Sequence, residues 1–241
     1  MISERASLER IVPDRLAPDE ATGALTLQLH LERYTFAASH ARPGRLLDIA
    51  CGVGYGTHLL RAHNPAIGCA IGVDNSDEAL CEARSMYAAP GVQFICADAM
   101  QFSSVEPFDT IVTLETIEHL PDPSQFFAKL VSLLRSGGVL IGSVPVTPSM
   151  DGNPFHRTDF SERSFRALAR RHHLTEIASL RQVQPFSAVA ICLGKEERAA
   201  RRLPELASFY LRHPHKLFLR IGSIANFGFN NRYLTVVWQK P

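Results

Sequence analysis

Two carboxylates and one imidazole lie within five positions of the sequence, at Glu115, Glu118 and His119. They follow residues 108–114, a short apolar run that is typical of a buried strand. If the chain turns helically after this run, the three residues stand at positions i, i+3 and i+4 and share one face. Carboxylate oxygens beside an imidazole nitrogen favour a divalent cation, Mg²⁺ or Mn²⁺. The sequence therefore predicts a metal site with these three ligands.

A fourth ligand is expected from "NPFHRTDFSERSF", which contains His156. This histidine follows a predicted strand at residues 138–144, so it belongs to the same edge of a sheet. A metal there would lower the pKa of a bound hydroxyl, and His119 and Glu118 are the predicted catalytic residues. Two alternatives stay open. In one, His119 acts as a general base without metal; in the other, these side chains only fasten their loops.

A glycine-rich turn, "LLDIACGVGYG", joins a predicted strand to a predicted helix. Gly52, Gly54 and Gly56 would let the backbone approach a ligand closely, and the helix amino terminus would offer free N–H groups. Asp48, at the end of the strand, is expected to help hold the same ligand. Asp74 ends the next strand about 20 residues later, where a carboxylate can accept both hydroxyls of a ribose. The spacing indicates a nucleoside cofactor.

These residues need a scaffold that brings strand ends together. Between residues 45 and 184 short apolar runs alternate with helical patterns, which predicts an α/β, Rossmann-like, doubly wound and mostly parallel sheet. Strands are expected at 45–50, 70–75, 92–98, 108–114, 138–144 and 232–239. Helices are expected at 25–38, 56–63, 76–88, 122–135 and 161–173, with "SGG" after Arg135 as a helix stop.

The glycine turn reads GxGxG, with Thr57 where a dinucleotide-binding GxGxxG motif would place its last glycine. Together with Asp74 and the later "CADAM", it resembles the S-adenosylmethionine loop of class I methyltransferases over residues 44–145. The resemblance implies seven strands, an N-terminal helical cap and a helical insertion before the last strand. It also implies that Asp98 faces the adenine amino group. The remaining cofactor-binding residues that it implies are Ala99, Met100 and Leu114.

A narrower resemblance concerns the acceptor. "ERIVP", "HLERYTFAA", "ETIEHL" and "NPFHRTDFS" look like bacterial methyltransferases that accompany cell-surface glycan and sugar-modifying pathways, although Val53 stands where those relatives often carry Glu. The ExxEH segment with a later histidine resembles metal-dependent small-RNA 2'-O-methyltransferases. The resemblance implies O-methylation of a hydroxyl on a sugar or glycoconjugate, with a metal holding the acceptor diol. The alternative is a metal-independent small-molecule O- or N-methyltransferase with His119 as base.

Composition limits the other partners. The 241 residues include 25 basic and 24 acidic side chains, so no overall field attracts nucleic acid. We expect a small-molecule or glycan acceptor, and a homodimer is one option. The sequence shows neither a signal peptide nor an apolar run of about 18 residues, so a cytoplasmic location is expected. One domain is predicted, with a cap at 1–41, a cofactor-binding core at 42–190, a helical insertion at 195–230 and a last strand at 231–241.

The remaining expectations concern basic side chains and histidines. Residues 195–220 carry seven Lys or Arg against three Glu, and we expect a solvated helix face there, with a lid or a membrane-surface helix as the alternative. His30 is expected only to pack or to face solvent. Arg10 and Arg33 are candidates to meet the methionine carboxylate or an acidic sugar.

Overall fold

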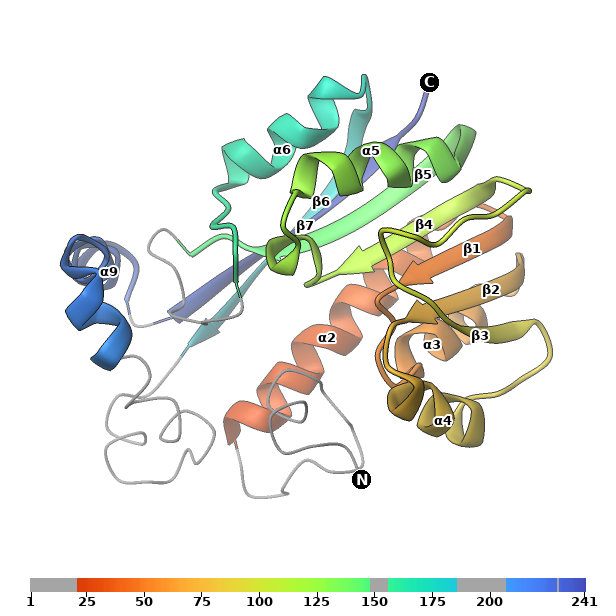
Figure 1. Ribbon diagram of the computed structural model, residues 1–241, viewed down its shortest axis with the longest axis horizontal. Coiled ribbons are helices and arrows are strands. Elements are labelled where there is room, and N and C mark those ends of the chain that lie inside the picture. Colours follow the sequence, from red (N-terminus) through yellow and green to blue (C-terminus); the bar gives the residue numbers. More distant parts are fainter. Residues whose placement is uncertain (1–20, 148–155, 186–206, 229) are drawn as a thin grey trace.

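The computed structural model describes residues 21–147, 156–185, 207–228 and 230–241, and a single sheet runs through its centre (Figure 1). The strand order is β3-β2-β1-β4-β5-β7-β6. The first five strands are parallel, and β7 is antiparallel to both β5 and β6. This confirms the predicted mostly parallel seven-stranded sheet. The strands are β1 Gly44–Ile49, β2 Ile67–Asp74, β3 Val92–Cys96, β4 Phe108–Leu114, β5 Leu134–Pro145, β6 Thr175–Pro185 and β7 Asn230–Gln239.

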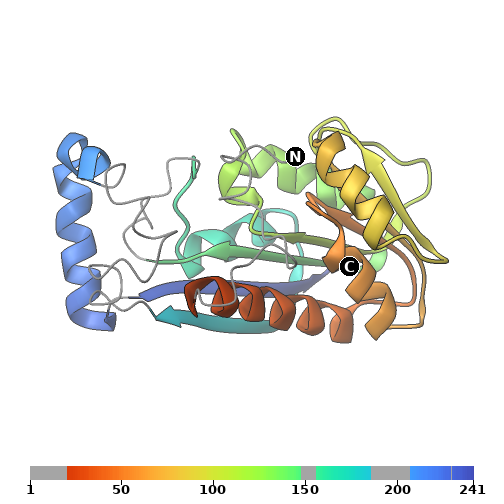
Figure 2. The same cartoon turned by 90° about the horizontal axis from the view of Figure 1, so that it is seen from below.

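Helices cover both faces of the sheet, with α2 on the face opposite α5 (Figure 2). Polar side chains cap the amino termini of three of these helices. The side chain of Ser76 accepts a hydrogen bond from the N–H of Ala79, and that of Asp122 from the N–H of Gln125. Ser161 forms a capping box before α6. The helices are α2 Ala21–His40, α3 Tyr55–His63, α4 Asp77–Met86, α5 Pro123–Leu133, α6 Glu162–Arg171 and α9 Pro214–Phe227; residues 207–212 are also helical.

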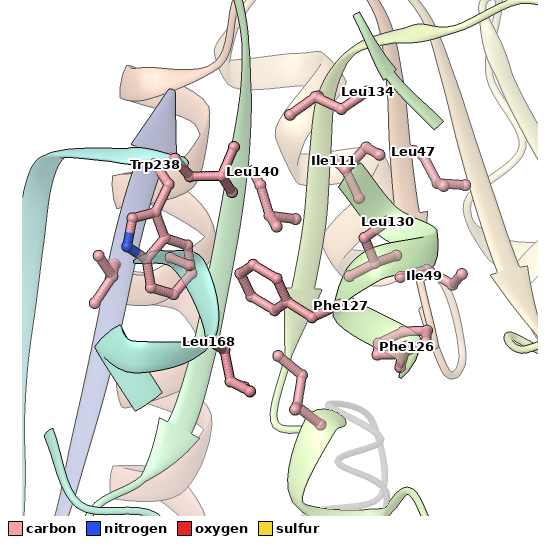
Figure 3. Packing of buried hydrophobic residues seen from close by; sticks show 14 of the residues in the cluster. Leu47, Ile49, Ile111, Phe126, Phe127, Leu130, Leu134, Leu140, Leu168 and Trp238 are labelled. Carbon is pink, nitrogen blue, oxygen red and sulfur yellow. The ribbon is translucent and has the colours of Figure 1, made fainter. Parts of the chain in front are cut away.

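The larger core cluster fills the space between the sheet and α5 and α6 (Figure 3). Phe126, Phe127 and Leu130 of α5 are fully buried against the central strands. Trp238 of β7 is 1% exposed and meets the ring of Phe127 edge-to-face, with centroids 5.4 Å apart. This packing fixes β7 between β5 and β6 and gives the carboxyl ends of the parallel strands a rigid base.

The structure differs from the expected elements at two places. The strand β6 is not among the individually expected strands, because it lacks an apolar run and the positions buried near its end, Gln182 and Gln184, are polar. The helix expected to end at "SGG" ends earlier, at Leu133. Gly137, with φ 78°, and Gly138 lie inside β5, where they exchange backbone hydrogen bonds with Lys240. The two glycines therefore allow β5 to bend and do not end a helix.

Buried glutamines attach α2 to the edge strand. The Nε2 of Gln182 donates to the carbonyl of Leu29 at 3.1 Å and to Glu32 at 2.8 Å, and Gln184 donates to Thr26 at 2.7 Å. The predicted N-terminal cap is thus a helix laid across one face of the sheet, although residues 1–20 lie outside the described part. In the described ranges no helix is long and apolar enough to cross a bilayer.

Candidate active site

A cavity of about 510 Å³ opens at the carboxyl ends of β1, β2 and β4. This volume is within the range of small-molecule sites. The loops after β1, β3 and β4 form most of its wall, and α2 closes one side with His30 and Tyr34. The position agrees with the rule that open α/β sheets bind ligands at the carboxyl edge.

The three glycines of the turn have different tasks. Gly52, with φ 57°, lines the cavity. Gly54, with φ 81°, does not line it; an added Cβ would lie 2.6 Å from the ring of Phe94. At Gly56 an added Cβ would overlap the ring of Tyr34. Of the glycines predicted to bind the cofactor, the structure brings Gly52 to the cavity, whereas Gly54 and Gly56 permit close packing behind it.

Two aspartates face the cavity with their orientation fixed by backbone N–H groups. Asp74 accepts a hydrogen bond from Gly52 at 2.9 Å on one oxygen and from Ser76 at 3.0 Å on the other. Asp98 accepts from the N–H of Met100 at 2.7 Å. Among the other predicted cofactor residues, Ala99 and Leu114 line the cavity and Met100 does not.

Asp48 lies beneath the glycine turn, outside the cavity wall, and is 1% exposed. Burial raises the pKa of this carboxyl to about 7, the Thr57 hydroxyl that donates to it at 2.7 Å acts in the opposite direction, and the charge of Asp74 raises it further. Asp48 therefore supports the turn from below and does not face the cavity.

Three of the four predicted metal ligands lie together. One donor atom from each of Glu118, His119 and His156 lies within 4.8 Å of the others. Glu118 is fully buried, and the rings of His119 and His156 are 4.7 Å apart at 75°. The carbonyl of Glu118 accepts hydrogen bonds from the N–H groups of Arg157 and Thr158, at 2.8 and 3.1 Å. These bonds bring the loop that carries His156 to the turn that carries His119.

Glu115 does not join this group, so the expected shared helical face is wrong. The residue has φ 51°, a left-handed backbone, and the short 3-10 helix that follows spans only Ile117–His119. The carboxylate of Glu115 accepts from the Ser143 hydroxyl at 2.7 Å and pairs with the buried Arg33 at 2.8 Å. It lines the cavity with its charge already compensated.

The donor set of the cluster fits a transition metal. Two ligands on opposite sides of an ion at about 2.1 Å lie about 4.2 Å apart, so small side-chain rotations would suffice. Two imidazoles with one carboxylate is a common set for first-row metals, whereas Mg²⁺ prefers oxygen ligands. Of the two ions expected from the sequence, Mn²⁺ suits Glu118, His119 and His156 better.

Two residues that the sequence analysis did not predict to line a ligand site, His30 and Arg157, lie in the cavity wall. His30 lines it and lies 3.2 Å from the Tyr55 hydroxyl. Burial, with a smaller effect of Arg33, lowers the pKa of His30 well below its ordinary value, so its ring is neutral at pH 7. Arg157 also lines the cavity, from a loop whose sequence carries no signal of it. Tyr34, one turn after His30 on α2, lines the same wall. Arg10 lies outside the described residues.

The central segment of the chain is similar to known sequences. Residues 47–142 match the family model described as a methyltransferase domain. A trans-aconitate 2-methyltransferase from Escherichia coli is 36% identical over 123 residues, which are 46% of this chain and 48% of that protein. The chain therefore spans about half the length of the curated relatives that it matches.

Solved structures share the fold over nearly the whole chain. The N-methyltransferase NodS from Bradyrhizobium japonicum, in complex with S-adenosyl-L-homocysteine, has a TM-score of 0.61 at 19% identity and covers 98% of this chain and 97% of its own. The [4+2]-cyclase SpnF has a TM-score of 0.62 at 17% identity, with coverages of 93% and 85%. At these identities the likeness shows the fold alone. Residues 47–142 are thus similar to a methyltransferase domain, within a chain that shares the fold of these solved structures.

Proposed function

We propose that this protein transfers the methyl group of S-adenosylmethionine to a hydroxyl of a sugar or glycoconjugate. One observation carries the proposal: a single cavity joins two fixed carboxylates, Asp74 and Asp98, to His119. The carboxylates suit the ribose and adenine of the cofactor. His119 lies at the wall where an acceptor oxygen would meet the methyl donor.

On the cofactor side, the proposed contacts use groups that are already oriented. Asp74 accepts the ribose hydroxyls, Asp98 accepts from the adenine amino group, and the turn at Gly52 leaves room for the backbone to approach. Because Glu115 is paired with Arg33, it adds little net charge near the sulfonium. Preorganised contacts of this kind hold the donor in line with the acceptor and supply much of the rate by proximity.

On the acceptor side, Glu118, His119 and His156 would hold a divalent ion, with Mn²⁺ favoured by the two imidazoles. Such an ion supplies a lowered pKa for a hydroxyl and a fixed direction for its oxygen. The buried Glu118 anchors the cluster, since its carbonyl fastens the loop of His156. The sugar as acceptor comes from the sequence resemblance, and the cluster supports it because two adjacent hydroxyls can share one ion.

The test combines metal content with activity. Purified protein is expected to contain about one equivalent of metal, and the Glu118→Gln variant much less. Methyl transfer to a panel of sugars should be abolished by EDTA and restored by Mn²⁺. The matched control is Glu106→Gln. Glu106 is exposed, pairs with Arg45 and is not part of the cluster. Full activity in EDTA would refute the metal-dependent form.

A second candidate is metal-independent methylation of a small molecule. The guanidinium of Arg157 at the cavity wall favours an anionic acceptor, and the relatives above are named for trans-aconitate. A carboxylate is already ionised at neutral pH and needs no base, so His119→Asn would change kcat little while Arg157→Gln would raise KM. With a hydroxyl or amine acceptor, a ring nitrogen of His119 would instead take the proton, and His119→Asn would lower kcat about 100-fold or more.

A further inference from the structure

The helical segment at residues 207–228 has an unusual composition. It contains Arg212, Lys216 and Arg220, two histidines and no acidic residue. It also holds several of the large apolar side chains that are exposed in the described part of the chain. These are Leu211 at 83%, Leu217 at 38%, Phe218 at 73%, Leu219 at 56% and Ile221 at 54% exposure.

The orientation of α9 is the reverse of an ordinary surface helix. Lys216, Arg220 and Ser223 stand at i, i+4 and i+7 and share one face. That face is turned toward the body of the protein, because Ser223 is buried, Arg220 is half-buried and the Nζ of Lys216 lies 3.6 Å from Asp159. The apolar side chains, led by Phe218, point outward. A surface helix normally turns its apolar stripe inward. The expected solvated charged face therefore does not hold for Lys216 and Arg220, whereas Arg212 is exposed as expected.

The outward face is also placed where a large partner can reach it. Both views show α9 at one end of the molecule, opposite the end formed by α4 and β3 (Figures 1 and 2). The cavity lies between these ends, beneath the loops after β1 and β4. A flat surface could contact α9 along its length without meeting the sheet.

We infer that the outward face of α9 binds the surface of an anionic phospholipid bilayer. Phe218, Leu219 and Ile221 would enter the boundary between headgroups and acyl chains, as in other helices that lie in a membrane interface. On its outward side the segment offers the headgroups the cation of the exposed Arg212 and no carboxylate. This mode of binding needs no membrane-spanning helix.

Charge argues against a second copy as the occupant. A two-fold interface buries the same surface patch on both copies. Both copies would then bring Arg212 and His215 to the interface, and the segment at 207–228 has no carboxylate to pair with them. Anionic lipid headgroups supply that missing charge.

The experiment is co-sedimentation of the full chain with vesicles. Vesicles of phosphatidylglycerol and phosphatidylcholine in equal parts are expected to bind the protein, more weakly at high salt, and vesicles of phosphatidylcholine alone much less. The double variant Phe218→Ser, Leu219→Ser should lower the bound fraction about tenfold or more. Met86→Ser, Val105→Ser is the matched control, because these side chains are at least as exposed as Leu219, at 56% and 104%, and lie away from α9.

Each variant must first keep the wild-type melting temperature, which we expect because the replaced side chains are exposed. The inference is overturned if the wild type stays in the supernatant with anionic vesicles, or if the α9 variant binds as the wild type does. It is also overturned if sedimentation equilibrium without vesicles shows a dimer that the α9 variant dissociates, since the face would then belong to a second copy.

Discussion

Replacing Gly56 by alanine is expected to destabilise the protein, although alanine is the better helix former. Gly56 lies in the first turn of α3, where the added Cβ would overlap the ring of Tyr34 from α2. Tyr34 is 5% exposed and packs edge-to-face on Tyr55, with centroids 5.6 Å apart. The ring cannot swing into solvent, so the two helices must separate.

The magnitude follows from two opposing effects. Overpacking a tight core contact costs about 1–3 kcal/mol, and alanine recovers up to about 1 kcal/mol of helix propensity. Because the overlap is with a buried ring, we use the upper end of the overpacking cost. The net loss for Gly56→Ala is then about 2 kcal/mol, which lowers the Tm of a chain of this size by about 4–8 °C. At Gly222, inside α9, nothing lies within 4 Å of an added Cβ, so Gly222→Ala should raise stability by about 0.5–1 kcal/mol.

The assay is thermal and urea unfolding of both variants, with the affinity for S-adenosyl-L-homocysteine measured by calorimetry. Because Tyr34 lines the cavity, Gly56→Ala should also weaken cofactor binding, whereas Gly222→Ala should not. In a Tyr34→Leu background the cost of Gly56→Ala should fall by more than half, as expected for directly contacting residues. Equal costs in both backgrounds, or a rise in Tm for Gly56→Ala, would refute the reasoning.

Three further predictions concern charges. Arg33→Met should destabilise the protein by about 3–5 kcal/mol in urea unfolding, because it leaves the carboxylate of Glu115 without its buried partner. Burial raises the pKa of Asp48 to about 7, so the folded protein holds this proton up to a higher pH than the unfolded chain does. The free energy of unfolding of the wild type, relative to Asp48→Asn, should therefore decline by up to about 4 kcal/mol as pH rises from about 4 to about 7. Above pH 7 this difference should stay constant. The hydrogen bond from Arg181 is the main cause that lowers the pKa of Glu162 to about 2. Glu162→Gln should therefore lower the free energy of unfolding by about 1 kcal/mol at pH 7. This loss should vanish as pH falls from about 4.5 toward 2, because Glu162 is then protonated in both states.

The sheet was predictable because its parallel strands are buried on both faces and read as apolar runs. The runs at β1, β2, β4 and β5 mark strands without any knowledge of their neighbours. The edge strand β6 gave no such signal, since its few apolar residues are interrupted by polar ones and its buried positions, Gln182 and Gln184, are polar. The position of β6 depends on its pairing with β7 and on the glutamines that bind α2. A local sequence pattern does not predict such pairing across the sheet.

The candidate site was predictable where it depends on strand ends. Asp74 and Asp98 face the cavity because they end or follow parallel strands. Glu115 was misplaced, because its left-handed backbone is stabilised by Arg33 and Ser143, which are distant in sequence. The helical spacing assumed for "ETIEH" took no account of such tertiary contacts, and neither Arg157 nor His30 has a local pattern that distinguishes a wall residue from a surface one.

During biosynthesis the sheet can be completed only after the ribosome has made β7. The strand β6 is at the edge of the sheet and hydrogen-bonds to β7, so a nascent chain that ends before residue 230 leaves both β6 and one edge of β5 unpaired. Unpaired edges promote aggregation. Arg33 of α2 also packs over the ring of Tyr233, 4.7 Å from its centroid. One wall of the cavity is therefore held in place by a strand that is translated much later, and the incomplete sheet is most exposed to aggregation during that interval.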